Sequence, residues 1–462
     1  MEVVVARLGE HAVVLGAGMG GLLAARVLST HYDRVTVVER DELPNQPEAR
    51  KGVPQGRHVH GLLPRGKDLL EKFFPGLVSE LVADGAVECD ALQEVRFNLA
   101  GYQLKRIPTG YTALQASRPF LEHHVRRRVA ALPGVVIRDG LDAAGLLHDS
   151  AAGRVIGVRV WDADHSTEED LRAGLTVASM GRGSAVNTWL DGLGYGRPAE
   201  EGAEIDIVYS SAYVRLPEGA LAGDKMITIG VRDMPPRALA LFAVDGNRHI
   251  LTLIGFGGER PPRDAEQFAE FVGTFAPRDV FDAIKNAEIL SPVSTFRYKA
   301  NKRRRYERMT DFPGGLLVTG DTLCSFSPVY GQGMTVAAIQ MDVLRRCLAR
   351  GDRHLARRFY RRVTSEIDNA WRLTVVADNA MPHVTADSVP DRVAALALDP
   401  MLAAAARDGI VAEKLFGVIG LVESPTALLH PKVTSRIGVA NAFAQLDRSA
   451  LAAARLVRSM RQ

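Results

Sequence analysis

Residues 11–39 begin with the apolar run His11-Ala-Val-Val-Leu15, which leads directly into the glycine-rich turn Gly16-Ala-Gly-Met-Gly-Gly21. A second apolar stretch, residues 22–31, follows the turn, and the run Val35-Thr-Val-Val38 closes the segment. Short β-branched runs that flank a longer apolar stretch are typical of a strand, helix, strand unit. The order predicts a βαβ opening with a glycine turn between its first strand and its helix.

The spacing of three glycines in this turn predicts a dinucleotide site. Gly16 permits a tight turn, Gly18 lets the backbone approach a pyrophosphate, and Gly21 lets the helix pack closely. The helix N-terminus adds free N–H groups and the positive end of a dipole. Glu39 follows Gly21 by 18 residues, at the end of the second strand, where a carboxylate accepts ribose hydroxyls and repels a 2′-phosphate. We therefore expect NAD or FAD rather than NADP.

A second motif, far along the chain, favours FAD over NAD. The apolar run 316–319 leads into Gly320-Asp321, and Ser327-Pro-Val-Tyr-Gly-Gln-Gly-Met334 then enters a helix expected to start near Gly331. An acid after a glycine turn can hold the hydroxyls of a ribityl chain. A helix N-terminus whose N–H groups are exposed by glycines can stabilise the anionic reduced flavin. The alternative interpretation is an ordinary capped connection between a strand and a helix. The glycine motif at residues 16–21 makes this alternative less favourable.

The rest of the chain divides into segments of different character. Residues 41–66 form a long functional loop without periodicity. Residues 117–132 read as a helix, and residues 135–138, 155–161 and 175–178 as strands that continue the first sheet. Alternation of apolar and polar residues over 204–257 predicts an antiparallel sheet. The helix after Gly331 should bury one stripe, which consists of Met334, Ala338, Met341, Leu344 and Leu348. After about residue 350 the Ala-, Leu- and Arg-rich chain reads as helical.

Composition excludes several classes of protein. The 462 residues carry a formal net charge of +3 and are 47% hydrophobic, which gives no basic field for nucleic acid. Three distant cysteines form no CxxC pair, so neither a disulfide framework nor a zinc site is expected. No apolar run reaches a membrane span, and no secretory signal is expected at the N-terminus. We expect a cytoplasmic enzyme in which the basic run 299–305 is a solvated face.

Five motifs in a fixed order identify the chain as similar to a known family. They are Gly16-x-Gly18-x-x-Gly21, Lys51-Gly-Val-Pro-Gln-x-Arg-His-x-His60, Ala116-Ser-Arg118, Gly181-Arg-Gly-Ser184 and Gly320-Asp-x-x-x-x-Phe-x-Pro-Val-Tyr-Gly-Gln-Gly-Met334. Over roughly residues 10–350 the combination resembles the group A FAD-dependent monooxygenases, and most closely the flavin-dependent epoxidases of polyketide and polyether antibiotic pathways. The chain departs from the usual Asp-Ala-Thr-Gly of these proteins, because it reads Ala178-Ser-Met-Gly181.

The resemblance implies FAD as the cofactor and assigns positions to it. Glu39 and Arg40 match the adenosine end, Arg118 the pyrophosphate and ribityl, Asp321 the ribityl, and residues 331–334 the flavin ring. The full expected set of cofactor-binding residues is Gly16, Gly18, Met19, Gly20, Gly21, Glu39, Arg40, Arg118, Gly181, Asp321, Pro328, Gly331, Gln332, Gly333 and Met334. No side chain is given a catalytic role, because the flavin carries the chemistry.

The expected fold is an α/β Rossmann-like FAD-binding domain with an inserted antiparallel substrate sheet and a helical C-terminal region. The FAD-binding domain would be assembled from residues 1–70, 115–185 and 300–345. The substrate-binding domain would take residues 71–114 and 186–299, and residues 346–462 would form the helical region.

The resemblance implies that reduced FAD reacts with O₂ to a C4a-hydroperoxide, which transfers one oxygen atom to the substrate. Apolar strands such as 205–214 and 250–256 would cover the flavin, so a lipophilic alkene, polyene or polyketide-type product is expected, epoxidised or hydroxylated. A second glycine motif for a nicotinamide nucleotide is not expected, because Gly255-Phe-Gly-Gly258 lacks the third glycine at the required spacing. The flavin is therefore expected to be reduced by transiently bound NAD(P)H or by a separate flavin reductase.

Three other activities use the same scaffold. A halogenase would carry Trp-x-Trp-x-Ile-Pro, whereas Trp161, Trp189 and Trp371 stand alone. A flavin-dependent reductase of a prenyl or polyene substrate stays open. So does a non-redox cyclase that keeps FAD as a structural element, for which the altered sequence at 178–181 leaves room.

Four further residues have two interpretations each. Arg118 clamps phosphate oxygens or is a solvated arginine at a helix start. Arg57, His58 and His60 contact flavin or substrate, or they belong to a solvated loop. We assign no metal to the two histidines, since no third ligand lies at a convincing spacing.

Overall fold

The computed structural model describes residues 7–385 and 388–442. Strand β1 (Gly9–Leu15) lies in the middle of a five-stranded parallel sheet with the order β19-β12-β1-β2-β8. Helix α1 (Met19–Leu28) connects β1 to β2 (Tyr32–Val38), so the predicted βαβ opening is confirmed. The other strands of this sheet are β8 (Val135–Arg138), β12 (Leu175–Ala178) and β19 (Leu316–Val318).

Helices cover this sheet, and α8 (Gly333–Leu348) is the most buried of them. It packs against α1, α2 (Pro64–Phe73) and α9 (Leu355–Asn379). The predicted stripe is buried, but so are Val336 and Ile339 on other faces. The predicted inward stripe is therefore confirmed, and the other faces are buried as well because neighbours surround this helix. Helix α4 (Arg118–Ala130) packs on α1, as expected for residues 117–132.

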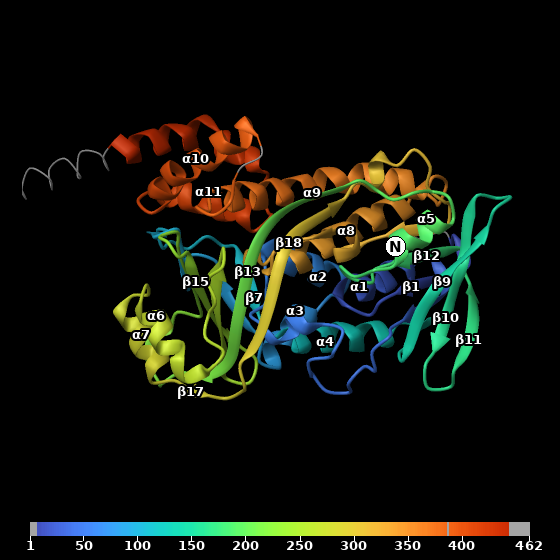
Figure 1. Cartoon of the computed structure of the whole chain (residues 1–462), viewed down its shortest axis with the longest axis horizontal. Helices are drawn as coiled ribbons and strands as arrows, with labels where there is room; N and C mark the ends of the chain where they lie inside the picture. The colour runs from blue at the N-terminus through green and yellow to red at the C-terminus, as the bar shows by residue number, and fades with distance from the viewer. Residues whose placement is uncertain (1–6, 386–387, 443–462) are drawn as a thin grey trace, which may run out of the picture.

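The strand predicted at 155–161 exists but does not extend the parallel sheet. It is β10 (Arg154–Asp162), which pairs antiparallel with β9 (Leu141–Asp149) and β11 (Thr167–Arg172) in a separate sheet. In the second half of this strand, buried and exposed residues alternate. This alternation suits a sheet with one solvated face. Figure 1 shows this sheet at the end of the molecule opposite α6 and α7.

The predicted antiparallel sheet is confirmed and is larger than expected. Its nine strands include β13 (Glu200–Arg215) and β18 (Ser294–Arg304), the long neighbouring strands in Figure 1. Strand β5 (Val95–Leu99) pairs with β14 (Met226–Val231), and among the described residues this is the only parallel pairing of the sheet. The others are β6 (Tyr102–Gln103), β15 (Arg237–Val244), β16 (Arg248–Phe256), β17 (Glu288–Ile289) and β20 (Cys324–Ser325).

The basic run 299–305 is not a solvated face, so that expectation was wrong. Arg303 and Arg304 are 3% and 5% exposed, since they lie on β18. Arg303 contacts Asp368 at 2.6 Å and Arg304 contacts Glu200 at 2.9 Å. Buried arginines require such partners, and these partners lie far away in the sequence.

The described part of the C-terminal region is helical, as predicted. It contains α9, α10 (Val389–Ala405) and α11 (Gly409–Ile419), while residues 443–462 lie outside the described residues. Leu402, Leu415 and Phe416 of this region form a hydrophobic cluster with Ala91 and Leu92. The C-terminal helices are thereby attached to the segment that leads into β5.

The remaining elements comprise a three-stranded sheet with the order β3-β7-β4 and four short helices. They are β3 (Gly61–Leu62), α3 (Leu77–Ala83), β4 (Val87–Asp90), β7 (Thr112–Gln115), α5 (Val186–Gly192), α6 (Phe268–Gly273) and α7 (Arg278–Lys285). Within residues 7–385 and 388–442, no helix combines the length and apolar character that crossing a bilayer needs.

The burial of α8 can be tested with the same substitution in two helices. Leu344 of α8 is fully buried, whereas Leu396 of α10 is 75% exposed. We expect Leu344→Ala to lower the free energy of unfolding by about 3 kcal/mol, and Leu396→Ala to change it by less than about 0.5 kcal/mol. Chemical denaturation measures both. Equal losses would contradict the central position of α8.

Candidate functional site

A cavity of about 1050 Å³ lies where the parallel sheet, the antiparallel sheet and the C-terminal helices meet. Every residue predicted from the sequence to bind the cofactor lines this cavity except Gly21. The structure therefore brings together side chains and backbone groups from three distant segments, residues 16–40, 118–181 and 321–334.

The glycine turn has the geometry that its spacing predicts. Gly16 has a φ of +99°, and a Cβ there would lie 2.5 Å from the Ser179 carbonyl oxygen. A Cβ on Gly21 would lie 1.8 Å from the Gly16 carbonyl oxygen. At Gly18 the nearest atom to such a Cβ is Arg50 Nη2 at 3.9 Å, so the space beside Gly18 is open toward the cavity. Gly16 and Gly21 thus close the turn, and Gly18 leaves room for a ligand.

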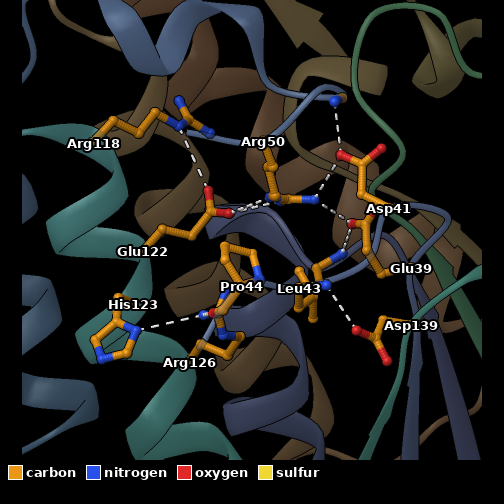
Figure 2. A network of polar contacts seen from close by, with 12 residues as sticks. Glu39, Asp41, Leu43, Pro44, Arg50, Arg118, Glu122, His123, Arg126 and Asp139 are labelled. Carbon is orange, nitrogen blue, oxygen red and sulfur yellow. Dashed lines mark hydrogen bonds and ion pairs between the residues drawn. The ribbon is translucent and has the colours of Figure 1, made fainter. Parts of the chain in front are cut away.

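A buried ion network holds the turn to the loop that follows β2 (Figure 2). Glu39 Oε2 accepts the Ala17 N–H at 2.7 Å and lies 3.0 Å from Arg50 Nη1. The Arg50 guanidinium also contacts Asp41 at 3.4 Å and Glu122 of α4 at 2.7 Å. Burial acts against the charge of Arg50, but Glu122 and Glu39 outweigh it and raise the pKa of this guanidinium. Sequence reasoning missed Arg50, because nothing local marks it as the partner of Glu39.

Arg118 lies at the first turn of α4, whose N-cap Ser117 accepts the Phe120 N–H at 3.4 Å. Its side chain is only 15% exposed and lies 3.6 Å from Glu122. The Nε atom is buried and has no hydrogen-bond partner in the described structure. A solvated arginine at a helix start does not fit these observations. That buried Nε is the atom that faces Glu122, whereas the two terminal nitrogens of the guanidinium have no hydrogen bond to another described residue. Because Arg118 lines the cavity, these terminal nitrogens are suited to an anionic ligand.

Asp321 faces the same cavity from the 3₁₀ turn Gly320–Thr322. Burial raises the pKa of its carboxyl, and the charges of Arg118 and Arg182 act in the opposite direction. Arg182 itself stacks over the Tyr298 ring at 4.2 Å. Asp321 has no hydrogen bond from another described residue, so its oxygens are available to the hydroxyls of a ligand.

The position of Ser179 shows how the altered sequence at 178–181 packs against the neighbouring glycines. A Cβ on Gly20 would lie 2.7 Å from Ser179 Oγ, and a Cβ on Gly320 would lie 2.8 Å from the same atom. The hydroxyl occupies a gap between two glycines from distant segments. Residues 179–184 line the cavity despite the departure from the usual motif.

The loop before α8 is fixed by a residue of α9 that the sequence did not reveal. Asp378 is 2% exposed and accepts hydrogen bonds from Tyr330 and, at 2.6 Å, from Asn301 Nδ2. Asn301 Oδ1 in turn accepts the Ser327 N–H at 2.6 Å. Burial raises the pKa of Asp378 to about 7. An acid of the C-terminal region therefore holds the segment in which Pro328, Gly331 and Gly333 line the cavity.

Some side chains of residues 57–60 are exposed at the surface, and others line the cavity. Arg57 is exposed, but His58 is 4% exposed, and both His58 and His60 line the cavity. For the two histidines the interpretation as a solvated loop was wrong. Burial and the charge of Arg57 lower the pKa of His58 to about 4, and burial and Arg118 lower that of His60 to about 3.

The far end of the cavity is apolar, but other segments than expected form it. Of the strands predicted to cover the flavin, only Tyr209, Ile254 and Phe256 line the cavity. Most of the apolar wall comes from β14 and β15, which belong to the expected substrate-binding segment 186–299, and from the C-terminal helices, for which the sequence suggested no role. These residues include Ile229, Leu239, Phe242, Leu398, Met401, Leu415 and Phe416.

The groups present fit the FAD expected from the sequence. Open space beside Gly18 and the terminal nitrogens of Arg118 suit a pyrophosphate, and the free Asp321 carboxylate suits a polyol. Among the residues that the structure describes, no three His, Cys, Asp or Glu side chains are placed to hold a metal ion.

Comparison with known proteins places the chain among flavoproteins. A family model described as FAD binding domain matches residues 10–351. Protein Rv3254 of Mycobacterium tuberculosis (strain ATCC 25618 / H37Rv) is 33% identical over 431 residues, which are 90% of each chain.

Several solved structures share the fold at low identity. A flavoprotein/dehydrogenase from Cytophaga hutchinsonii is 13% identical, with a TM-score of 0.70 over 95% of this chain and 100% of that one. The Diels-Alderase PyrE3 of the pyrroindomycin pathway is 16% identical, with a TM-score of 0.61 over 90% and 81%. OxyS anhydrotetracycline hydroxylase from Streptomyces rimosus is 18% identical, with a TM-score of 0.60 over 90% and 76%. At these identities the likeness establishes the fold alone.

The raised pKa of Asp378 predicts a pH-dependent stability. The folded protein binds this proton more tightly than the unfolded chain, whose aspartates titrate near pH 3.9. Stability therefore falls as pH rises from about 4 to about 7 and is constant above that. We expect the free energy of unfolding of Asp378→Asn, relative to wild type, to rise over that window by up to about 4 kcal/mol. Chemical denaturation at a series of pH values measures it, and a difference that does not vary with pH would contradict the assignment.

Proposed function

The chain belongs to the FAD binding domain family, and from that membership we propose that it is an FAD-dependent monooxygenase acting on a lipophilic substrate. The observation that carries the proposal is that one cavity has the residues expected to bind the nucleotide at one end and an apolar wall at the other. A redox cofactor and a lipophile can therefore lie side by side without water between them.

Three features of the cavity would hold FAD. The backbone beside Gly18 and the N-terminus of α1 would receive the pyrophosphate, and Arg118 would donate from its terminal nitrogens. Asp321 would accept the ribityl hydroxyls. The N-terminus of α8 would face the pyrimidine edge of the flavin and favour its anionic form. The proposed set comprises Gly16, Gly18, Met19, Gly20, Gly21, Glu39, Arg40, Arg118, Gly181, Asp321, Pro328, Gly331, Gln332, Gly333 and Met334.

Glu39 has a double role in this proposal. It lines the cavity at the expected adenosine end, yet its carboxylate already accepts the N–H groups of Ala17 and Asp41 and pairs with Arg50. One oxygen lone pair is left for a ribose hydroxyl. Glu39 would therefore act mainly by fixing the turn, and secondarily as a direct ligand of the adenosine.

Bound FAD, once reduced by NAD(P)H or by a separate flavin reductase, supplies the chemistry that activates O₂ for transfer of one oxygen atom. The chain's own contribution is position and exclusion of water. Ile229, Leu239 and Phe242 on one side and Leu415 and Phe416 on the other enclose the apolar end. This wall favours an alkene, polyene or polyketide-type substrate, as in the epoxidases that the motifs resemble.

We propose the same assignment of segments to FAD binding and substrate binding as the sequence suggested. Residues 1–70, 115–185 and 300–345 would hold FAD, and residues 71–114 and 186–299 would hold the substrate. Residues 346–462 would contribute through α10 and α11, whose side chains line the apolar end in the described part.

Two glycine variants separate folding from FAD binding. Gly21→Ala places a methyl group 1.8 Å from a carbonyl oxygen, whereas Gly18→Ala places one in open space. We expect Gly21→Ala to lower the unfolding free energy of the apoprotein by about 3 kcal/mol or more. Gly18→Ala should leave apoprotein stability unchanged and weaken FAD binding at least tenfold. Thermal unfolding and FAD titration measure the two effects. Undiminished FAD affinity in Gly18→Ala would contradict the site.

Oxygen transfer can be tested before the substrate is known. The reduced holoprotein is supplied with a pool of polyketide and isoprenoid lipophiles under equal parts of ¹⁶O₂ and ¹⁸O₂. Products of a monooxygenase appear in mass spectra as isotopic doublets, because one atom comes from O₂. Products that gain only hydrogen, or isomers formed equally without oxygen, would contradict the proposal and point to a reductase or a cyclase respectively.

A further inference from the structure

The hydrogen bonds of His58 determine which of its nitrogens carries the proton. Nδ1 lies 2.7 Å from Ser211 Oγ, and Ser211 Oγ lies 2.7 Å from Thr252 Oγ1. Thr252 Oγ1 also accepts the Val59 N–H at 3.1 Å. If Nδ1 donated to Ser211, and Ser211 to Thr252, the Thr252 hydroxyl proton would have no acceptor, although Thr252 is 0% exposed. The opposite order satisfies every hydroxyl, since Thr252 donates to Ser211 and Ser211 donates to Nδ1.

His58 therefore carries its proton on Nε2. No described residue bonds to Nε2, and this atom is not fully buried. The ring packs between Tyr209 and Phe296, with centroids 5.9 and 5.8 Å away, and lines the cavity. His58 thus offers an N–H donor to a ligand in the cavity.

His60 has the opposite tautomer. Its Nδ1 lies 3.0 Å from the carbonyl oxygen of His58. A carbonyl oxygen only accepts, so Nδ1 must carry the proton and Nε2 has a free lone pair. His60 also lines the cavity, and no described residue bonds to its Nε2. His60 thus offers an acceptor.

Both rings stay neutral at ordinary pH, because burial lowers the pKa of His58 to about 4 and that of His60 to about 3. The two residues are separated by one position, His60 is bonded to the His58 backbone, and both side chains line the same cavity. A fixed donor and a fixed acceptor lie together in a cavity whose far end is apolar.

We propose that His58 and His60 recognise an oxygen atom of the substrate, with His58 donating to that oxygen and His60 accepting from its hydroxyl proton. The substrate is then a lipophile that carries a hydroxyl group, and a pure hydrocarbon polyene is disfavoured because it would leave both nitrogens unpaired. The inference rests on the proposed function, since it takes the second occupant of the cavity to be the substrate.

Three naphthalenes that differ at one position test this pair on the FAD-loaded, oxidised protein. 2-Naphthol can donate and accept, 2-methoxynaphthalene can only accept, and 2-methylnaphthalene can do neither. Equilibrium dialysis gives the Kd of each. The free energy of desolvating a given probe is the same for every variant. We therefore compare the ratio of two probes' Kd values in each variant with the same ratio in the wild type.

Each histidine should control a different ratio. We expect His58→Phe to reduce the preference for 2-methoxynaphthalene over 2-methylnaphthalene about fivefold relative to wild type. His60→Phe should leave that ratio unchanged and reduce the preference for 2-naphthol over 2-methoxynaphthalene about fivefold. His165→Phe, in the turn between β10 and β11, is the control and should change neither ratio. Unchanged ratios, or absence of binding by all three probes, would overturn the proposal.

Two further variants keep the test independent of the phenylalanine substitutions. His58→Asn can still accept from Ser211 but is too short to present a donor, so it should lose the preference for 2-methoxynaphthalene. His58→Gln places an amide N–H near the position of Nε2 and should retain it. Equal ratios in these two variants would overturn the assigned donor.

The two histidines could instead contact the flavin, and failure of the proposed function must be told apart from failure of this inference. A loss of FAD content in the variants without a change in the probe ratios would mean that the flavin is the partner, which overturns the inference. Expected probe ratios without isotopic doublets would contradict the monooxygenase reaction alone. Doublets with unchanged ratios would contradict the histidine assignment alone.

Discussion

The ion pair between Glu39 and Arg50 is the contact on which the geometry of the site depends. Arg50 is 6% exposed in its side chain and is shared by Glu39, Asp41 and Glu122, which come from the end of β2, the following loop and α4. Without Arg50 three carboxylates would lie close together in a poorly solvated place, and breaking a buried pair of this kind costs about 3–5 kcal/mol. The same Glu39 holds the glycine turn through the Ala17 N–H.

This arrangement explains how an irregular loop can contribute fixed groups to a cavity. Asp41 accepts the Gly52 N–H at 2.7 Å and so fixes the loop near its middle. At its far end Thr252 accepts the Val59 N–H, which ties the loop to β16 of the antiparallel sheet. His58 lies between these anchors and His60 directly follows the second, so both histidines are presented from a loop that is bound to both sheets. On the opposite side Asp378 of α9 does the same for the segment before α8.

The local part of the fold could be read from the sequence, and the long-range part could not. The βαβ opening, helix 117–132 and the antiparallel sheet follow from periodicity and glycine spacing, which are properties of neighbouring residues. Strand 155–161 was assigned to the wrong sheet, and the basic run to the surface, because the partners Asp368 and Glu200 are distant in sequence. The site showed the same limit. Its glycines and acids were found, but Arg50, Asp378, the buried histidines and the apolar wall of α10 and α11 become evident only in three dimensions.

The central claim is that FAD in this cavity activates O₂ beside an enclosed apolar space, where water is excluded. Stopped-flow absorbance tests it most directly, by mixing anaerobically reduced holoprotein with oxygenated buffer and following the flavin bands. We predict that reoxidation passes through a transient species whose spectrum differs from those of the reduced and oxidised forms. Reoxidation in one step without such a species would contradict it, and would favour a reductase or a protein that keeps FAD as a structural element.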